Sequence, residues 1–466
     1  MSFYSRSKTI WLSVAVSIFG FAGLSAAQDT KPFLQDIQVQ RDTPETAATP
    51  LVKKTSAVDV VKPTTISYSP IVTNIPTLEN VAIPGYSGIL VETLDGEPVV
   101  ESGSRLTYNP ASNVKIATSY AVLKTFGPDY RFATSVWTDG SYEPETGTIH
   151  GNLYISGRDP VFGYEHAMAL ANELNRMGIR NVQGDLVVTD NFAMNYTTSP
   201  AKASQMFFKT LDTAKRPVAA VHDWKSRLIN TGQLTSVPEP PSVTFSGSVY
   251  VQSMPSNAKL LFSHESAPMR EIVKAMMCYS NNFLAERLGD MVGGPYAVAR
   301  IVQQDTGSMP GEFYLQSSSG LGINRVTPAS MMKLLRVLRS ELGRNRMTFA
   351  DIMPVAGVDK GTLENRFDTD FSVGSVIGKT GTLGNTDGGV SALAGEMNTR
   401  GGRLLFVIFN QRGSVARFRS FQNNYVSTIQ GQFGGAAPIS YSATSLDYRL
   451  SKTRISYPSG QTRGSL

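Results

Sequence analysis

The chain has few of the residues that form disulfide bridges or coordinate metal ions. Its 466 residues include a single cysteine, Cys278, so an intramolecular disulfide is excluded. Cys278 lies in the apolar stretch "KAMMCYS", where a small buried hydrophobic residue is the default interpretation. There are only four histidines and no H-E-x-x-H pattern, so the sequence implies no metal and no organic cofactor.

Long basic runs are also missing. The formal net charge is +6 and the pI is about 9.2, which favours attraction to polyanions. No Lys/Arg run and no basic stretch interleaved with aromatic residues is present, so nucleic acid is not an expected partner. For an exported protein, peripheral association with an anionic cell wall or membrane surface is the more natural expectation. The sequence does not indicate an oligomeric state.

The N-terminal segment has the pattern of a secretory signal peptide. Residues 1–27 combine the basic residues Arg6 and Lys8, the apolar run "IWLSVAVSIFGFAGL" and small residues before a cleavage point after Ala27. The alternative is an uncleaved membrane anchor, because the stretch 10–27 is uncharged and long enough to consider spanning. Either interpretation predicts an exported, periplasmic protein.

The remaining chain divides by composition. A Thr/Pro-rich linker, mostly disordered, is predicted for residues 28–78 and a loosely ordered polar tail for 421–466. Between them we expect a main domain in two parts, 79–131 and 261–420, interrupted by a strand-rich inserted subdomain at 132–260. The hairpin signal at Asp95-Gly96 and the paired strands of "GGVSALAGEMNTRGGRLLFVIFNQ" favour an α/β fold of the α+β type, with an antiparallel sheet packed by helices.

The first chemical motif is an S-x-x-K pair in "NPASNVKIATSYAVLKTFG". Asn109 is a natural N-cap, Pro110 a natural first helical residue and Gly127 a natural helix end. Positions i and i+3 share a helix face, so the Lys115 amine can reach the Ser112 hydroxyl and, once desolvated, accept its proton. The spacing alone is weak evidence, because it also occurs at Ser5/Lys8, Ser199/Lys202 and Ser330/Lys333.

The second motif is "YSNN", which contains Ser280 and Asn282 between two helical runs. Considered alone, it is a plain polar connection between helices. The functional interpretation places the Ser280 hydroxyl and the Asn282 amide in a cleft, where they relay a proton and hold a substrate amide.

The third motif is "GKTGTLG", which precedes a strand. Without a function, this motif would simply be the end of a strand followed by a turn. In the functional interpretation, the side chains of Lys379, Thr380 and Thr382 bind a carboxylate of the substrate. Gly381 permits a ligand to approach the backbone closely.

The three motifs together, in this order, are stronger evidence for a catalytic function than each motif alone. S-x-x-K, S-x-N and K-T-G follow one another along the chain, and Ser330 cannot be the first member because it comes after Ser280. This set is similar to that of the penicillin-recognising serine enzymes. Over residues 85–413 the sequence resembles the class C penicillin-binding proteins, which are D-alanyl-D-alanine carboxypeptidases and endopeptidases. The resemblance includes "NPASNVK", "GNLYISGRDP", "FSHESAPMREIVKAMMCYSNNFLAE" and "SSSGLGINRVTP". It implies a transpeptidase/β-lactamase-like domain.

The resemblance also implies roles for the catalytic residues. Ser112 matches the acylated nucleophile and Lys115 its general base. Ser280 and Asn282 match the pair that relays a proton and holds the substrate.

Substrate-binding residues are implied in the same way. Lys379, Thr380, Gly381 and Thr382 match the strand that binds the terminal carboxylate of the substrate. The backbone N–H groups of Ser112 and Thr382 would form the oxyanion hole.

The implied function is a serine DD-peptidase acting on peptidoglycan stem peptides and inhibited by β-lactams. The alternatives are a non-catalytic wall-binding homologue, or a β-lactamase or esterase with the same motifs. Three departures from the family bear on specificity. The insertion before Ser280 is short, a tryptophan-rich segment is replaced by "FAMNYTTSPAKASQMFFK", and Ser317 stands where the family has aspartate.

Overall fold

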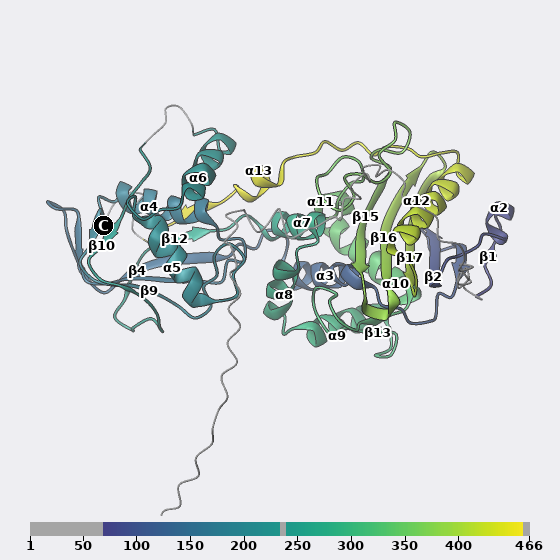
Figure 1. The fold of residues 1–466 in the computed structure, drawn as a ribbon, viewed down its shortest axis with the longest axis horizontal. Coiled ribbons are helices and arrows are strands. Elements are labelled where there is room, and N and C mark those ends of the chain that lie inside the picture. Colours follow the sequence, from purple (N-terminus) through teal and green to yellow (C-terminus); the bar gives the residue numbers. More distant parts are fainter. Residues whose placement is uncertain (1–68, 234–238, 460–466) are drawn as a thin grey trace, which may run out of the picture. The chain divides into compact units, whose positions relative to one another are not determined.

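The computed structural model describes residues 69–233 and 239–459 (Figure 1). The expected signal peptide or anchor and most of the expected linker lie outside these residues. The last part of that linker was expected to lack order but does not. Val72–Thr73 forms strand β1, which pairs with β3 (Pro98–Ser102), and Pro76–Glu79 forms helix α2. In the part of the chain that is described, no helix has the length and apolarity needed to cross a membrane.

The main domain is built on a six-stranded antiparallel sheet, as expected. In spatial order its strands are β1, β3, β2 (Tyr86–Thr93), β17 (Gly402–Gln411), β16 (Val390–Thr399) and β15 (Val376–Leu383). The predicted hairpin turn at Asp95-Gly96 joins β2 to β3, with Gly96 at a φ of 94°. The predicted glycine-rich turn joins β16 to β17. Both hairpin predictions are confirmed.

Helices cover both faces of this sheet, which explains why β16 and β17 are buried at nearly every position. The helices of the main domain are α3 (Val114–Phe126), α7 (Met269–Tyr279), α8 (Asn282–Met291), α9 (Pro295–Thr306), α10 (Pro328–Arg344), α11 (Phe349–Ile352) and α12 (Val415–Gln432). Ala392 and Ala394 of β16 pack into the core that holds α3, α7 and α10. The alternate residues Leu393 and Met397 pack with Val426 of α12.

The inserted part is an α/β subdomain with its own core and two small sheets. One sheet has the order β10 (Thr244–Phe245), β8 (Asn181–Val182), β6 (Thr148–His150) and β5 (Ser141–Glu143). The other has the order β11 (Val249–Val251), β9 (Leu186–Val188), β7 (Leu153–Gly157), β4 (Ala133–Thr138), β12 (Lys259–Glu265) and β18 (Arg454–Ser456). Its helices are α4 (Tyr164–Arg176), α5 (Pro200–Leu211) and α6 (Val218–Asn230). The predicted boundary at 260 falls inside β12, which pairs with β4.

The C-terminal segment is more ordered than expected. Residue 421 lies within α12, whose side chains Tyr425, Val426 and Ile429 are buried against the sheet. The exposed face of α12 includes Ser420, Asn424, Ser427 and Thr428, which give the stretch the polar composition of a loose tail. A further short helix, α13 (Leu446–Leu450), precedes β18. The prediction of a loosely ordered tail is therefore wrong for the described residues.

Candidate active site

Ser112 lies on a tight turn in front of α3 rather than inside the helix. Residues Ala111–Asn113 form a 3-10 turn, and α3 begins at Val114. Asn109 is therefore not the N-cap of α3, although its Oδ1 accepts a hydrogen bond from the Ala111 N–H at 3.0 Å. Ala111 has a φ of 46°, a conformation that costs energy outside glycine. The turn holds Ser112 partly exposed at the start of a buried helix.

Lys115 lies fully buried one turn further on, and its amine contacts the serine. Its Nζ donates to Ser112 Oγ at 3.0 Å, to Asn282 Oδ1 at 2.7 Å and to the Ser319 carbonyl at 2.7 Å. Burial, followed by the nearby charge of Lys379, holds the pKa of Lys115 well below its usual range. A neutral amine in this position can take the Ser112 proton.

Ser280 and Asn282 come together with the two lysines, as the motif order predicts. Ser280 ends α7 in the left-handed conformation, with a φ of 56°, and Asn281 caps α8. Lys379 Nζ donates to Ser280 Oγ at 2.9 Å and to the Thr380 carbonyl at 2.8 Å. Burial lowers the pKa of Lys379 to about 7. A hydrogen-bonded set of side chains thus links the first, second and third motifs.

Strand β15, with the K-T-G motif, is the edge strand next to the nucleophile turn. A Cβ atom at Gly381 would lie 2.7 Å from the Pro110 carbonyl oxygen and 3.0 Å from the Ser112 nitrogen. The close approach that Gly381 permits is therefore that of the protein's own backbone, not only that of a ligand. Only glycine lets the strand lie this close to Ser112.

Arg419 was not predicted from the sequence. It lies on α12, and its Nη2 donates to Thr382 Oγ1 at 3.0 Å. Its side chain adds a cation beside the threonine expected to bind a carboxylate. Arg419 follows the last motif by almost forty positions, so no local pattern points to it.

Glu286 is a second residue that the motifs did not indicate. Its carboxylate accepts the N–H groups of Ser318 and Ser319 at 3.1 and 3.0 Å, which orients the loop whose carbonyl binds Lys115. Glu286 lies four positions after Asn282, on the same face of α8, so helical spacing was an available signal.

Ser317, the residue in place of the family aspartate, lies in the same loop and makes hydrogen bonds within it. Its Oγ accepts the Gly320 N–H at 3.0 Å and donates to the Leu321 carbonyl at 2.8 Å. A serine hydroxyl can thus hold this turn by donating one hydrogen bond and accepting another.

The competing S-x-x-K pairs that are described serve local structure. Ser199 is the N-cap of α5, and Ser330 is buried in the first turn of α10, where its N–H is capped by Thr327. Cys278 is buried, as expected, and burial raises the pKa of its thiol to about 12.

A comparison with protein families gives an independent result. The D-Ala-D-Ala carboxypeptidase 3 (S13) family matches residues 73–210 and 239–428. The match covers both parts of the main domain and most of the inserted subdomain.

Individual relatives agree with that match. The D-alanyl-D-alanine carboxypeptidase DacB of Haemophilus influenzae is 25% identical, over 69% of this chain and 84% of the relative. A D-alanyl-D-alanine carboxypeptidase of an Actinomadura species is 26% identical, over 78% of this chain and 84% of the relative. The penicillin G-acylated Bd3459 predatory endopeptidase of Bdellovibrio bacteriovorus has a similar structure, with a TM-score of 0.67 and 22% identity over 80% of this chain and 99% of that one. At that identity the structural likeness shows a shared fold.

Proposed function

The chain belongs to the D-Ala-D-Ala carboxypeptidase 3 (S13) family, and on this premise we propose that Ser112 is the nucleophile with which this serine DD-peptidase cleaves peptidoglycan stem peptides. One observation carries the assignment. A fully buried lysine amine, the Nζ of Lys115, lies 3.0 Å from the Ser112 hydroxyl. Burial lowers the pKa of this amine and so favours the neutral form, which is the base that an unactivated serine needs.

Acylation begins with transfer of the Ser112 proton to the Lys115 amine. The Ser112 oxygen forms a bond to the carbonyl carbon of the penultimate D-alanine, and the carbonyl oxygen becomes an oxyanion. The backbone N–H groups of Ser112, on the 3-10 turn, and of Thr382, on β15, would stabilise this charge. The C–N bond then breaks, and the terminal D-alanine leaves with a proton relayed through Ser280.

The carboxylate of the substrate is bound on the other side of the site. Lys379, Thr380 and Thr382 lie on edge strand β15, and Arg419 approaches the Thr382 hydroxyl. Cationic and hydroxyl donors give charge-assisted hydrogen bonds to a carboxylate. This arrangement favours substrates with a free C-terminal carboxylate over internal peptide bonds.

Water completes the cycle by hydrolysing the ester at Ser112, with the Lys115 amine again available as the base. β-Lactams enter the same acylation path, since their strained amide and carboxylate present the same two groups. The amine released from a β-lactam ring stays tethered to the acyl group, so it cannot diffuse away as D-alanine does. A long-lived Ser112 ester is the expected product. The penicillin G-acylated relative supports this part of the proposal.

Export is part of the same proposal, because peptidoglycan lies outside the cytoplasm. The signal-like pattern of residues 1–27 supports it. The net charge of +6 supports association of the exported protein with an anionic wall or membrane surface.

Release of D-alanine from a peptide ending in D-Ala-D-Ala tests the assignment. The wild-type protein should release one D-alanine per peptide, and Ser112→Ala should release none. Ser330→Ala, the same change in another S-x-x-K pair, is the matched control and should retain activity. D-Alanine release by Ser112→Ala at the wild-type rate would contradict the proposal.

A further inference from the structure

Helix α7, which is capped at its C-terminus by Ser280, carries two buried charged side chains. Glu271 lies in its first turn and is 4% exposed, and Lys274 lies one turn later and is 0% exposed. Burying a charge is costly unless it is paired. The partners of both residues come from parts of the chain far from α7 in sequence.

Lys274 binds the segment that precedes the K-T-G strand. Its Nζ donates to Asp359 Oδ2 at 2.7 Å and to the carbonyls of Ala350 and Met353 at 2.8 and 2.6 Å. Asp359 Oδ2 also accepts the Val355 N–H at 2.8 Å. All three N–H bonds of the Lys274 ammonium are thereby used within a dry site.

The segment bound by Lys274 contacts both walls of the active site. The Gly378 N–H, one residue before Lys379, donates to the Pro354 carbonyl at 3.2 Å. The Thr362 N–H donates to the Cys278 carbonyl, in the last turn of α7, at 2.9 Å. The position of α7 relative to β15 is therefore set in part by the ion pair between Lys274 and Asp359.

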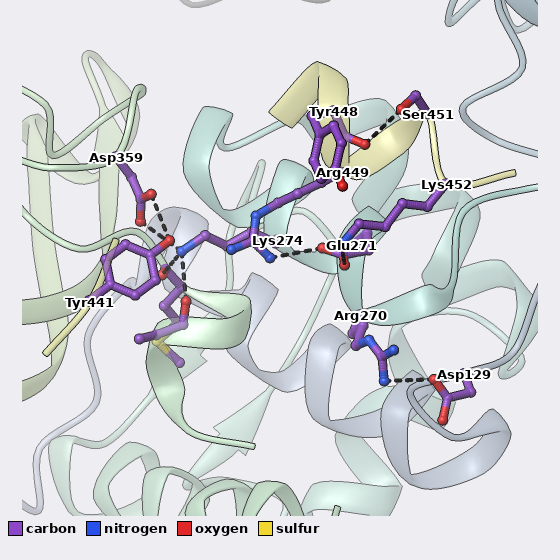
Figure 2. Close-up of polar contacts among 12 residues, drawn as sticks. Asp129, Arg270, Glu271, Lys274, Asp359, Tyr441, Tyr448, Arg449, Ser451 and Lys452 are labelled. Carbon is purple, nitrogen blue, oxygen red and sulfur yellow. Dashed lines mark hydrogen bonds and ion pairs between the residues drawn. The ribbon is translucent and has the colours of Figure 1, made fainter. Parts of the chain in front are cut away.

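The C-terminal strap, residues 439–456, closes over this ion pair. Tyr441 donates its hydroxyl to Asp359 Oδ1 at 2.8 Å, and its ring centroid lies 5.1 Å from Lys274 Nζ (Figure 2). One tyrosine thus binds the carboxylate with its hydroxyl and the ammonium with its ring face.

The strap makes a second attachment at the start of α7. Arg449 Nη1 donates to Glu271 Oε2 at 2.9 Å, and Lys452 Nζ donates to Glu271 Oε1 at 2.8 Å (Figure 2). Two residues further, Arg454 binds Glu265 at the end of β12, and the strap joins β12 as strand β18. Both ends of the connection from the inserted subdomain to α7 are therefore held by cations of the strap.

We propose that the C-terminal strap is a positioning element for the catalytic site, which sets the contact between Ser280 and Lys379 by fixing α7 at Glu271 and at the Lys274–Asp359 pair. Ser280 lies at the very end of α7, so a shift of the helix along its axis moves the Ser280 hydroxyl directly. The inference rests on the proposed function, because it concerns the rate of acylation at Ser112. The strap residues act on this contact through α7 and through the segment that carries Asp359.

Two substitutions detach the strap without deleting it. Glu271→Gln removes the charge that holds Arg449 and Lys452. Tyr441→Phe removes a single hydroxyl and keeps the ring over Lys274. Tyr425→Phe is the matched control, because Tyr425 is also a buried tyrosine, lies on α12, and has a hydroxyl without a hydrogen-bond partner among the described residues.

The readout is acylation of the full chain by benzylpenicillin, separated into the dissociation constant of the non-covalent complex and the rate constant of acylation. Misplacement of Ser280 should lower the rate constant about 10- to 100-fold in Glu271→Gln and less in Tyr441→Phe, with the dissociation constant unchanged. Tyr425→Phe should match the wild type. Should Glu271→Gln fail to fold, Tyr441→Phe decides alone.

Unchanged rate constants in both variants would overturn the inference. So would a loss of rate accompanied by an equal weakening of the non-covalent complex, since that indicates general damage. Failure of the proposed function is distinguishable, because the wild-type protein itself would then form no adduct at Ser112.

Discussion

Replacement of Lys115 by methionine should slow acylation of Ser112 by benzylpenicillin about 10²- to 10⁴-fold, the range that general-base catalysis contributes. Methionine keeps the buried apolar stem and removes the amine that donates to Ser112, Asn282 and Ser319. At 1.36 kcal/mol per decade, the loss corresponds to about 3 to 5.5 kcal/mol in the activation free energy. The assay is the second-order rate constant of adduct formation, with thermal unfolding as the check that the variant is folded.

The pH dependence of the same variant gives a sharper test. Burial and the charge of Lys379 keep the pKa of Lys115 well below its usual value, which favours the neutral amine that can act as a base. The acylation rate of the wild type should therefore rise less steeply with pH than that of the variant. In Lys115→Met, hydroxide must take the proton, so the residual rate should rise by up to about tenfold per pH unit.

Lys333→Met is the matched control, since Lys333 belongs to the competing S-x-x-K pair on α10. Its acylation rate should equal that of the wild type. The reasoning is refuted if Lys115→Met is folded and acylates within about threefold of the wild-type rate, because general bases contribute far more than that.

Three further outcomes follow from individual contacts. Arg419→Gln removes the cation beside Thr382 and should raise KM for D-Ala-D-Ala peptides about tenfold with little change in kcat, as steady-state kinetics will reveal. Burial raises the pKa of Asp159 to about 7, above its unfolded value, so its stabilising contribution is complete below about pH 4 and is lost as the pH rises through 7. As the pH rises from 5 to 8, the free energy of unfolding of the wild type should therefore fall by about 2.5 kcal/mol relative to that of Asp159→Asn. A difference between the two proteins that does not change with pH would contradict this. Ser317→Ala loses the hydrogen bonds to Gly320 and Leu321, and should lower the stability by about 1 to 2 kcal/mol in denaturant unfolding.

The sequence predicted that the three motifs lie together, because each motif is short and its residues are close in sequence. The i, i+3 spacing correctly predicted that the Lys115 amine reaches the Ser112 hydroxyl, although Ser112 lies on the 3-10 turn before α3. The order of the motifs excluded Ser330. The hairpins were equally local, since Asp95-Gly96 needs only its neighbours to form a turn. Local patterns of this kind can be predicted because the residues that determine the structure are neighbours in the sequence.

Contacts between distant segments could not be predicted in the same way. Arg419 contacts Thr382, and Tyr441 contacts Asp359 across 82 positions, because the tertiary fold brings these distant segments together. The C-terminal strap lacks sustained periodicity, so its order comes from ion pairs with Glu265 and Glu271 and from pairing with β12. The 3-10 turn at Ala111 likewise depends on the close approach of β15.

The most direct test of the central claim is the intact mass of the purified protein after exposure to benzylpenicillin, with the adduct located by peptide digestion. A single adduct of the mass of the drug, mapped to Ser112 and absent from Ser112→Ala, is the predicted result. An unmodified protein with intact drug, or an adduct on another residue, would contradict the assignment of Ser112. Unmodified protein with hydrolysed drug would instead indicate a β-lactamase, in which deacylation outpaces acylation.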